Sequence, residues 1–222
     1  MSRSNANEPF AALTWDDLDK LSAAIVHDLL VSAAKVPDCD VLFYRKPDEP
    51  PDEFLNPLRK KVKFCEVQGT SFAEEIRTAV EQAFAGQYRR VIVVLEYHPL
   101  ITPRFFNKVF DRLTYEDDCL VVGPTIDGRC FLVGMKSNHC DLFASAGTDP
   151  IGKSNLLLHR LCGKDAVLFP TPSRTMLNSG HNLLGLREVL ERSSLDEGYV
   201  PKRTLDVLKK IEKKYKVKHS VR

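Results

Sequence analysis

The sequence VVGPTIDGRCFLVGM, residues 121–135, decides the fold class of this chain. Two short runs rich in Val, Leu and Phe flank the segment Gly-Pro-Thr-Ile-Asp-Gly. Apolar runs of about four to eight residues bounded by Gly and Pro are typical of buried strands. We therefore predict a strand, a turn and a second strand, in which the turn is either a plain hairpin or the rim of a ligand site.

The segments around this stretch alternate between helical and strand patterns. Thr14 is the expected cap of a helix that runs to about residue 34, and Ser71 and Thr102 are expected to cap two more. The expected strands are DVLFYR (40–45), VKFCEV (62–67), RRVIVVLE (89–96) and DAVLFP (165–170). Because RRVIVVLE is almost continuously apolar, we place it at the centre of the sheet. The alternation predicts a three-layer α/β/α fold with a mostly parallel sheet.

Composition and charge limit the functional classes. The chain has 222 residues, a net charge of +2 and no apolar run of the roughly 18 residues that a membrane span needs. Its first residues lack the apolar core of a secretory signal, so we expect a cytoplasmic protein without a membrane span.

Basic residues gather at the end of the chain. Residues 201–222 hold nine Lys or Arg against two acids, so we divide the chain into one α/β domain, 1–200, and a basic amphipathic helix, 201–222. Such a helix can bind nucleic acid or anionic lipid, but it is more often the solvated face of a helix that docks on its own domain. We therefore rank nucleic acid last among the partners.

The sequence GTDPIGKS, residues 147–154, matches the pattern of a phosphate loop. In that loop, backbone N–H groups surround phosphate, while Lys153 and Ser154 would supply the charge and the magnesium ligand. About a dozen mixed residues separate the pattern from the preceding strand, and Asp149 would repel phosphate. Two interpretations of this segment therefore remain open: a phosphate-binding loop, or a helix that begins at Pro150.

The stretch 121–135 also resembles a known family signature. Gly123, Pro124, Asp127 and Gly128 stand in the frame of a strand that ends in Gly-Pro and is followed by Asp-Gly and by a second strand that ends in Gly. This frame, with the order of the surrounding pieces, resembles the bacterial family known as domain of unknown function 2064. That family is similar to glycosyltransferase-A-fold enzymes, which are nucleotide-diphospho-sugar transferases.

The resemblance implies a site, and the chain departs from it. By resemblance Asp127 would be catalytic, and the substrate would contact Gly123, Pro124, Gly128, Arg129, Tyr97 and His98. Tyr97 stands where the family has a metal-type Asp, and Arg129 stands where it has a second Gly. Asn178 similarly replaces an acid of a later Asp-rich segment, and the family's first strand and phosphate-binding loop have no counterpart before Thr14.

These departures favour loss of the chemistry over loss of the fold. A transferase of this kind holds Mg²⁺ or Mn²⁺ with carboxylates to neutralise a diphosphate, and Glu96 would be the remaining candidate ligand. We expect a degenerate member that needs no cofactor and acts as a binding or scaffold protein, with a homodimer or a partner protein covering the exposed sheet. The alternative is an active nucleotidyl- or glycosyltransferase with Glu96, Asp127 and Arg129 as ligands, and a nucleotide-sugar as its substrate.

Overall fold

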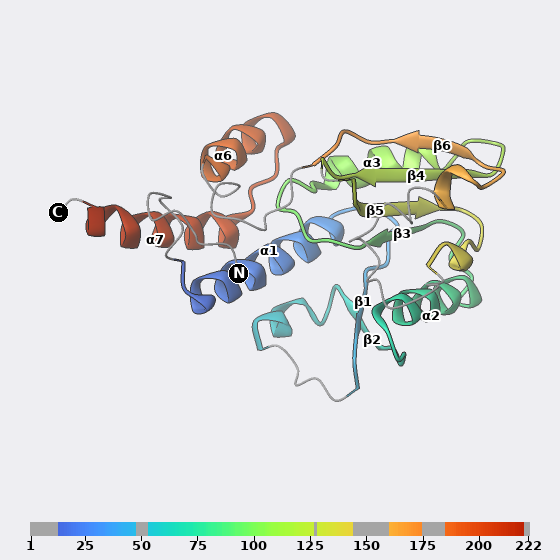
Figure 1. The fold of residues 1–222 in the computed structure, drawn as a ribbon, viewed down its shortest axis with the longest axis horizontal. Helices are drawn as coiled ribbons and strands as arrows, with labels where there is room; N and C mark the ends of the chain where they lie inside the picture. Colours follow the sequence, from blue (N-terminus) through green and yellow to red (C-terminus); the bar gives the residue numbers. More distant parts are fainter. Residues whose placement is uncertain (1–12, 48–52, 127, 144–159, 175–184, 220–222) are drawn as a thin grey trace.

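The computed structural model describes residues 13–47, 53–126, 128–143, 160–174 and 185–219 (Figure 1). The first elements are α1 (Trp15–Ala33), β1 (Leu42–Arg45), the 3-10 helix η1 (Glu53–Leu58), β2 (Lys63–Glu66), α2 (Phe72–Ala85) and β3 (Val91–Val94). They are followed by α3 (Pro103–Arg112), β4 (Cys119–Pro124), β5 (Cys130–Met135), the 3-10 helix η2 (Cys140–Phe143), β6 (Val167–Pro170), α6 (Leu186–Glu197) and α7 (Lys202–His219).

The predicted helix starts are confirmed. Thr14 caps α1 with a full capping box, in which its side chain accepts a hydrogen bond from the backbone of Asp17 while the Asp17 carboxylate accepts from the backbone of Thr14. Ser71 and Thr102 likewise accept hydrogen bonds at the starts of α2 and α3. Polar residues followed by an apolar stripe therefore located these helices correctly.

The strands of the described residues form two sheets. β1 and β2 pair in parallel, and the other four strands lie in the order β3-β5-β4-β6. β5 is antiparallel to both of its neighbours, whereas β4 and β6 are parallel. It follows that β3, β4 and β6 share one direction and that only β5 runs against them, which confirms the predicted α/β class.

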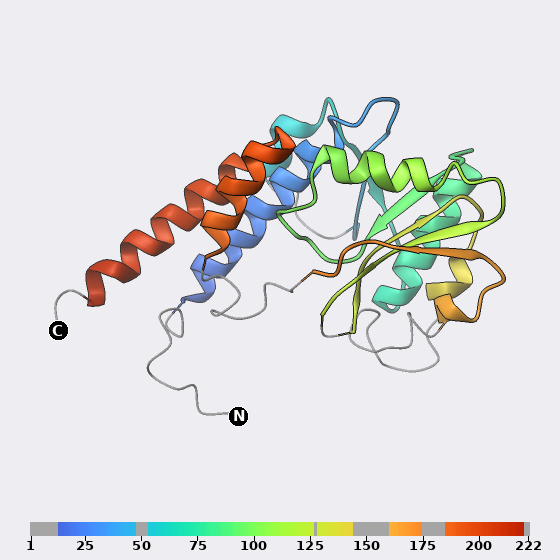
Figure 2. The same ribbon diagram turned by 90° about the horizontal axis from the view of Figure 1, so that it is seen from above.

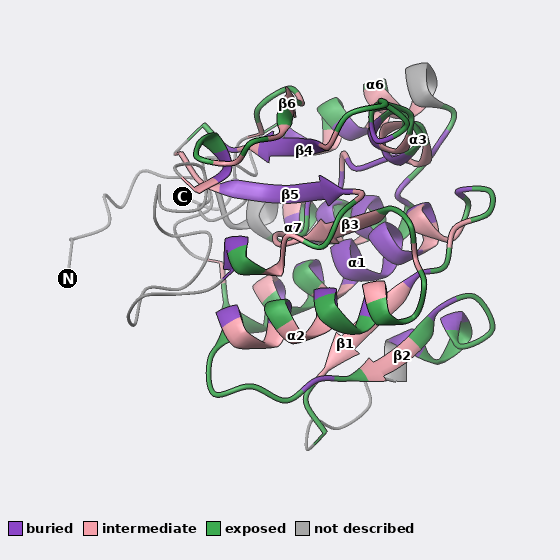
Figure 3. Cartoon of the chain, turned by 90° about the vertical axis from the view of Figure 1, so that its right-hand side faces the viewer, coloured by how far each residue is buried: buried purple, intermediate pink, exposed green. Residues whose placement is uncertain are grey.

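The stretch 121–135 forms the centre of the larger sheet. β4 and β5 pair in antiparallel register, with Val121 opposite Gly134, and the register shifts between Gly123 and Pro124. Both strands are buried almost throughout, as their purple colour in Figure 3 shows. The predicted strand, turn and strand are confirmed, and the shift in register marks the point where the turn begins.

The placement of RRVIVVLE at the centre of the sheet was wrong. Its apolar part forms β3, which is an edge strand of the four-stranded sheet and pairs, within the described residues, with β5 alone. Helices cover both faces of β3, because Val91 and Val93 pack toward α2 while Ile92 and Val94 pack toward α3. A continuous apolar run indicates that both faces of a strand are buried. An edge strand with a helix on each face is buried in the same way, so the run does not show the position of the strand in the sheet.

Helices cover both faces of the larger sheet. Leu120 and Val122 of β4 pack with α2 and η2, whereas the alternate residues Cys119 and Val121 pack with α3 and the end of α1. These two apolar clusters are the outer interfaces of a three-layer α/β/α arrangement.

A helical arm extends from the sheet. α7 lies along α1, and Figures 1 and 2 show the two helices side by side and leading away from the strands. Leu205, Leu208 and Ile211 of α7 are buried against α1 and α6, so the apolar stripe predicted for the end of the chain is a packing surface. None of the described helices has the length and the apolar content needed to cross a membrane.

Candidate functional site

The strand ends bring several predicted site residues to one edge of the sheet. Because β3, β4 and β6 run in the same direction, the residues that follow them lie at a common edge. Ligands of open α/β sheets bind at this edge, outside the carboxyl ends of the strands. We call residues 96–98, 123–126, 128–129 and 171–174 the strand-end site.

The turn between β4 and β5 is held by its own hydrogen bonds. The backbone N–H of Arg129 donates to Thr125 Oγ1 at 2.7 Å, and the backbone N–H of Thr125 donates to the carbonyl of Arg129 at 2.8 Å. The Gly128 N–H donates to the Thr125 carbonyl at 3.1 Å, and Gly128 has a φ of 80°, where glycine is favoured. The turn therefore holds the Arg129 backbone in one place.

Arg129 and Glu96 form the central ion pair of the strand-end site. Arg129 Nη1 lies 2.8 Å from Glu96 Oε1, and the two side chains are 16% and 24% exposed. The backbone N–H groups of Leu95 and Glu96 both donate to the Phe131 carbonyl, which places Glu96 beside the start of β5. A cation from the turn before β5 thus pairs with the carboxylate that follows β3.

Tyr97 and His98 point to different environments. Tyr97 is 48% exposed, whereas His98 is buried with only 3% exposed. His98 Nδ1 accepts a hydrogen bond from the backbone N–H of Leu100, and the His98 carbonyl accepts one from Ile101. His98 therefore shapes the connection to α3, and of these two predicted substrate contacts Tyr97 has the more accessible side chain.

Arg174 belongs to the site although the sequence analysis missed it. Its backbone N–H donates to the Pro124 carbonyl and its carbonyl accepts from Ile126, which joins the segment after β6 to the turn. Arg174 Nη2 donates to the Leu100 carbonyl at 3.2 Å, and the guanidinium lies over the Phe105 ring. Only the pairing of β6 with β4 places Arg174 here, so no local pattern could have identified it.

Gly123 and Cys130 have packing roles in the same hairpin. A Cβ atom on Gly123 would lie 2.7 Å from Cζ of Phe131, a ring that is fully buried. Burial also raises the pKa of the Cys130 thiol to about 12, so this thiol stays protonated near neutral pH. Gly123 of the family frame therefore serves the packing of the hairpin, and Pro124 ends β4 at the register shift.

Several predicted residues lie outside the described part of the chain. These are Asp127, Asn178, and the segment 147–154 with Lys153 and Ser154. Within the described residues, His, Cys, Asp and Glu side chains form no group of three that could hold a metal ion. Of the described side chains at the strand ends, the Glu96 carboxylate is engaged by a guanidinium and Tyr97 offers a phenol, so these two groups by themselves do not fit a divalent cation.

Comparison with a solved structure supports the fold. The chain is similar to the crystal structure of a protein from Desulfovibrio desulfuricans G20 that is described provisionally as a nucleotide-diphospho-sugar transferase. The similarity covers 94% of this chain and 90% of the other, with a TM-score of 0.73 and 19% identity. At this identity the likeness shows a common glycosyltransferase-A-like fold. The search of curated proteins returned no match.

A family model matches the part of the chain that holds most of the larger sheet. The match runs over residues 29–148, which is more than half of the chain and includes the β4–β5 hairpin together with Glu96 and Arg129. The chain therefore belongs to the DUF2064 family, which is described as an uncharacterized protein conserved in bacteria.

Proposed function

We propose that this DUF2064 protein has lost metal-dependent nucleotide-sugar transfer and acts in the cytoplasm as a binding or scaffold protein. The observation that carries the proposal is the ion pair between Glu96 and Arg129. It lies at the strand ends, where open α/β sheets bind their ligands.

The ion pair opposes a divalent cation at this position. A metal that bridges a diphosphate needs carboxylate oxygens with spare coordination capacity, because the metal shares its charge between protein and phosphate. The Glu96 carboxylate already accepts a charge-assisted hydrogen bond from Arg129. Such a bond contributes about 1.5–3 kcal/mol, and the partial exposure of the two side chains lowers this contribution. A metal ion would have to displace Arg129 and then tolerate its positive charge nearby.

Isothermal titration of the full chain with nucleotide-sugars, with and without excess MnCl₂ or MgCl₂, tests the loss of activity. UDP-glucose and GDP-mannose are suitable probes of the two common base types. We expect no saturable, metal-dependent heat from the wild-type protein. Micromolar affinity that requires the metal, about 8 kcal/mol of binding free energy, would overturn the proposal and support the active transferase with Glu96, Asp127 and Arg129 as ligands.

The variant Arg129→Gly tests whether the ion pair is the reason. It frees the Glu96 carboxylate and restores the Gly that the family resemblance places there, so we expect it to bind Mn²⁺ more tightly than the wild type does. Arg129→Lys keeps the cation and is the matched control. Equal Mn²⁺ affinity in all three proteins would remove the ion pair as the explanation.

The phosphate-loop alternative has its own test. Thermal shift with ATP and Mg²⁺ should leave the wild type unchanged if the segment 147–154 does not bind nucleotide. A shift that the substitution Lys153→Ala abolishes would assign nucleotide binding to that segment.

We also propose that a second copy of the chain covers the exposed edge of the sheet. Within the described residues, β1 pairs only with β2 and β3 only with β5, so each has a backbone edge with no strand beside it. The four residues of β1 and the four residues of β3 are all half-buried. In β3 this partial exposure remains although helices pack on both of its faces. Light scattering should give twice the chain mass of 25.1 kDa; a monomer at all concentrations would contradict the homodimer and leave a different protein as the partner.

A further inference from the structure

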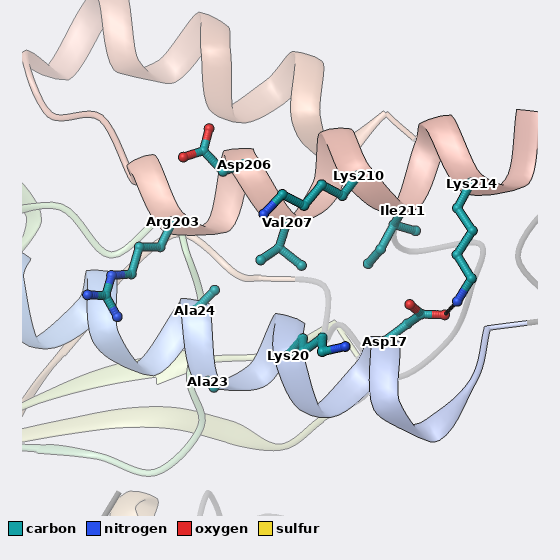
Figure 4. A pocket seen from close by; sticks show the side chains of 10 residues that line it. All are labelled: Asp17, Lys20, Ala23, Ala24, Arg203, Asp206, Val207, Lys210, Ile211 and Lys214. Atoms are coloured by element: carbon teal, nitrogen blue, oxygen red, sulfur yellow. Dashed lines mark hydrogen bonds and ion pairs between the residues drawn. The ribbon is translucent and has the colours of Figure 1, made fainter. Parts of the chain in front are cut away.

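A groove between α1 and α7 lies apart from the strand-end site. The two helices run antiparallel, because Lys214 binds Asp17 at one end, at 2.7 Å, and Asp28 accepts a hydrogen bond from the backbone of Thr204 at the other. The groove has a volume of about 510 Å³, and Figure 4 shows the residues of α1 and α7 that line it. No residue of the strand-end site lines it.

The floor of the groove is apolar and shallow on the α1 side. Ala23 and Ala24 of α1 and Val207 and Ile211 of α7 line this floor, and Figure 4 shows Ala24 on the side of α1 that faces α7. Ala24 is 6% exposed and Ile211 3%, so these apolar side chains are recessed. Each of these α1 residues carries only a methyl group, so α1 adds little side-chain bulk to the groove.

The rim of the groove is positively charged. Lys20, Arg203, Lys210 and Lys214 stand along it, against only two acids, Asp17 and Asp206. Asp17 is bound by Lys214, and Lys20 pairs with Asp16 outside the groove in an exposed bridge. The lining therefore holds two more cations than acids, and a ligand that lies on the apolar floor would meet a rim of net positive charge.

The spacing of the lining residues matches the length of a helix. On α7 the lining runs from Arg203 to Lys214, a span of twelve residues and about 16 Å along the helix axis. An amphipathic helix of about three turns would lie along this length with its apolar stripe on the floor, and acidic residues beside the stripe would reach the rim. Recognition of an amphipathic helix by an apolar groove is a common mode of peptide binding.

We propose that the α1–α7 groove binds an acidic amphipathic helix of a partner protein. This inference adds a partner class to the binding role proposed above but does not rest on the loss of transferase activity, because the two sites share no residue. A membrane is the less suitable occupant. Binding to lipid requires apolar side chains that project beyond the charged ones, and here the apolar side chains form the floor.

The test uses a designed peptide, since it needs only the stated chemistry. A fluorescein-labelled 18-residue peptide with Leu at every third or fourth position and Glu and Ala elsewhere is titrated with the full chain, and binding is followed by anisotropy. We expect saturable binding to the wild-type protein. A peptide of the same composition with the helical spacing of Leu destroyed should bind at least about tenfold more weakly, because its apolar stripe is gone.

Three variants separate charge from shape. Lys210→Glu reverses a rim charge and should weaken binding at least about tenfold. Ala23→Gln fills the floor without changing the charge and should weaken binding about fivefold. Lys213→Glu makes the same charge change on the same helix at an exposed position that does not line the groove, and binding should stay within about threefold of wild type. Circular dichroism melts confirm that each variant is folded.

Three outcomes would overturn the proposal. Equal binding of the scrambled peptide would show attraction by charge alone, and equal weakening by Lys210→Glu and Lys213→Glu would remove the groove as the site. Co-sedimentation with phosphatidylcholine and phosphatidylserine vesicles, in the absence of any peptide binding, would assign the surface to a membrane instead.

Discussion

Gly123 shows how a single missing side chain allows the central hairpin to pack. The Phe131 ring occupies the place that a Cβ atom on Gly123 would need, and it is fully buried between the sheet and α3. Because protein interiors are close-packed, a shift of this buried ring would disturb its other neighbours. The glycine of the family frame is therefore required by packing.

The substitution Gly123→Ala should destabilise the chain by about 1–3 kcal/mol, because the added methyl group overlaps the Phe131 ring. Urea unfolding measures the change. Gly86→Ala is the control, since the nearest atoms to its added Cβ lie 3.3 Å away at a helix end, and we expect less than about 1 kcal/mol there. Equal effects of the two substitutions would contradict the packing role.

His27 makes the stability of α1 depend on pH. Burial, and after it the charge of Arg203, lower the pKa of His27 below its usual value of 6.5, against the opposing effect of Asp28. The unfolded chain then binds a proton at a higher pH than the folded chain does. The free energy of unfolding should fall as the pH drops from about 7.5 through 6.5, and this loss should stop below the folded pKa.

The variant His27→Gln tests this dependence. It cannot take up the proton, so its free energy of unfolding, measured by urea at several pH values, should fall less than that of the wild type over the same range. Parallel curves for the two proteins between about pH 5 and 7.5 would mean that His27 does not contribute to the pH dependence.

At the scale of elements, α7 is attached to α1 by a buried polar contact as well as by its apolar stripe. The Asp28 carboxylate accepts a hydrogen bond from the backbone N–H of Thr204 at 2.8 Å, in the first turn of α7. A carboxylate at a helix N-terminus satisfies a backbone donor and interacts favourably with the helix dipole. The Tyr199 hydroxyl donates to the Asp28 carbonyl beside it, so one turn of α1 holds the start of α7.

Removing this acceptor should loosen α7. We expect Asp28→Ala to lower the free energy of unfolding by about 1–3 kcal/mol, because a buried N–H loses its partner, and Asp28→Asn to cost less because an acceptor oxygen remains. Asp19→Ala, at an exposed position of the same helix, should change stability by less than about 0.5 kcal/mol. If Asp28→Ala were as mild as Asp19→Ala, the contact would not secure the helix.

At the scale of the whole molecule, the described strands form two sheets. The two sheets are connected by helices that pack against both of them and not by hydrogen bonds between strands. The β1–β2 pair packs on α1 and η1, while β4 and β5 lie between α2 and α3. Within the described residues no ladder joins β1 to β3. The molecule therefore has a core strand pair that is hydrogen-bonded on both sides and outer strands that are bonded on one.

Hydrogen exchange should reproduce this division. In the protein at low concentration, amides of β4 and β5 should exchange most slowly. Those of β3 and β1 should exchange faster, because within the described residues each of these strands has a strand on one side only. Mass spectrometry of peptides that cover residues 91–94 and 130–135 measures the difference. Equal protection of the two segments would show that another strand covers β3.

Much of the fold and only part of the site could be predicted from local pattern. Capping residues with apolar spacing located α1, α2 and α3, and the hairpin of residues 121–135 was confirmed, since these features depend on neighbours in the chain. The position of β3 was predicted wrongly because two-sided burial does not distinguish an edge from a centre. Arg174 was missed because it reaches Pro124 only through the parallel pairing of β4 and β6.

By itself, the sequence determined the class of the protein, the starts of its helices and its membership of the family, because spacing and turn residues act over a few positions. Only the tertiary structure decided that Glu96 and Arg129, 33 residues apart, neutralise each other, and that α1 and α7 enclose a basic groove. Charged residues from distant segments come into contact only through the strand order and the helix packing, and a local sequence pattern does not predict such contacts.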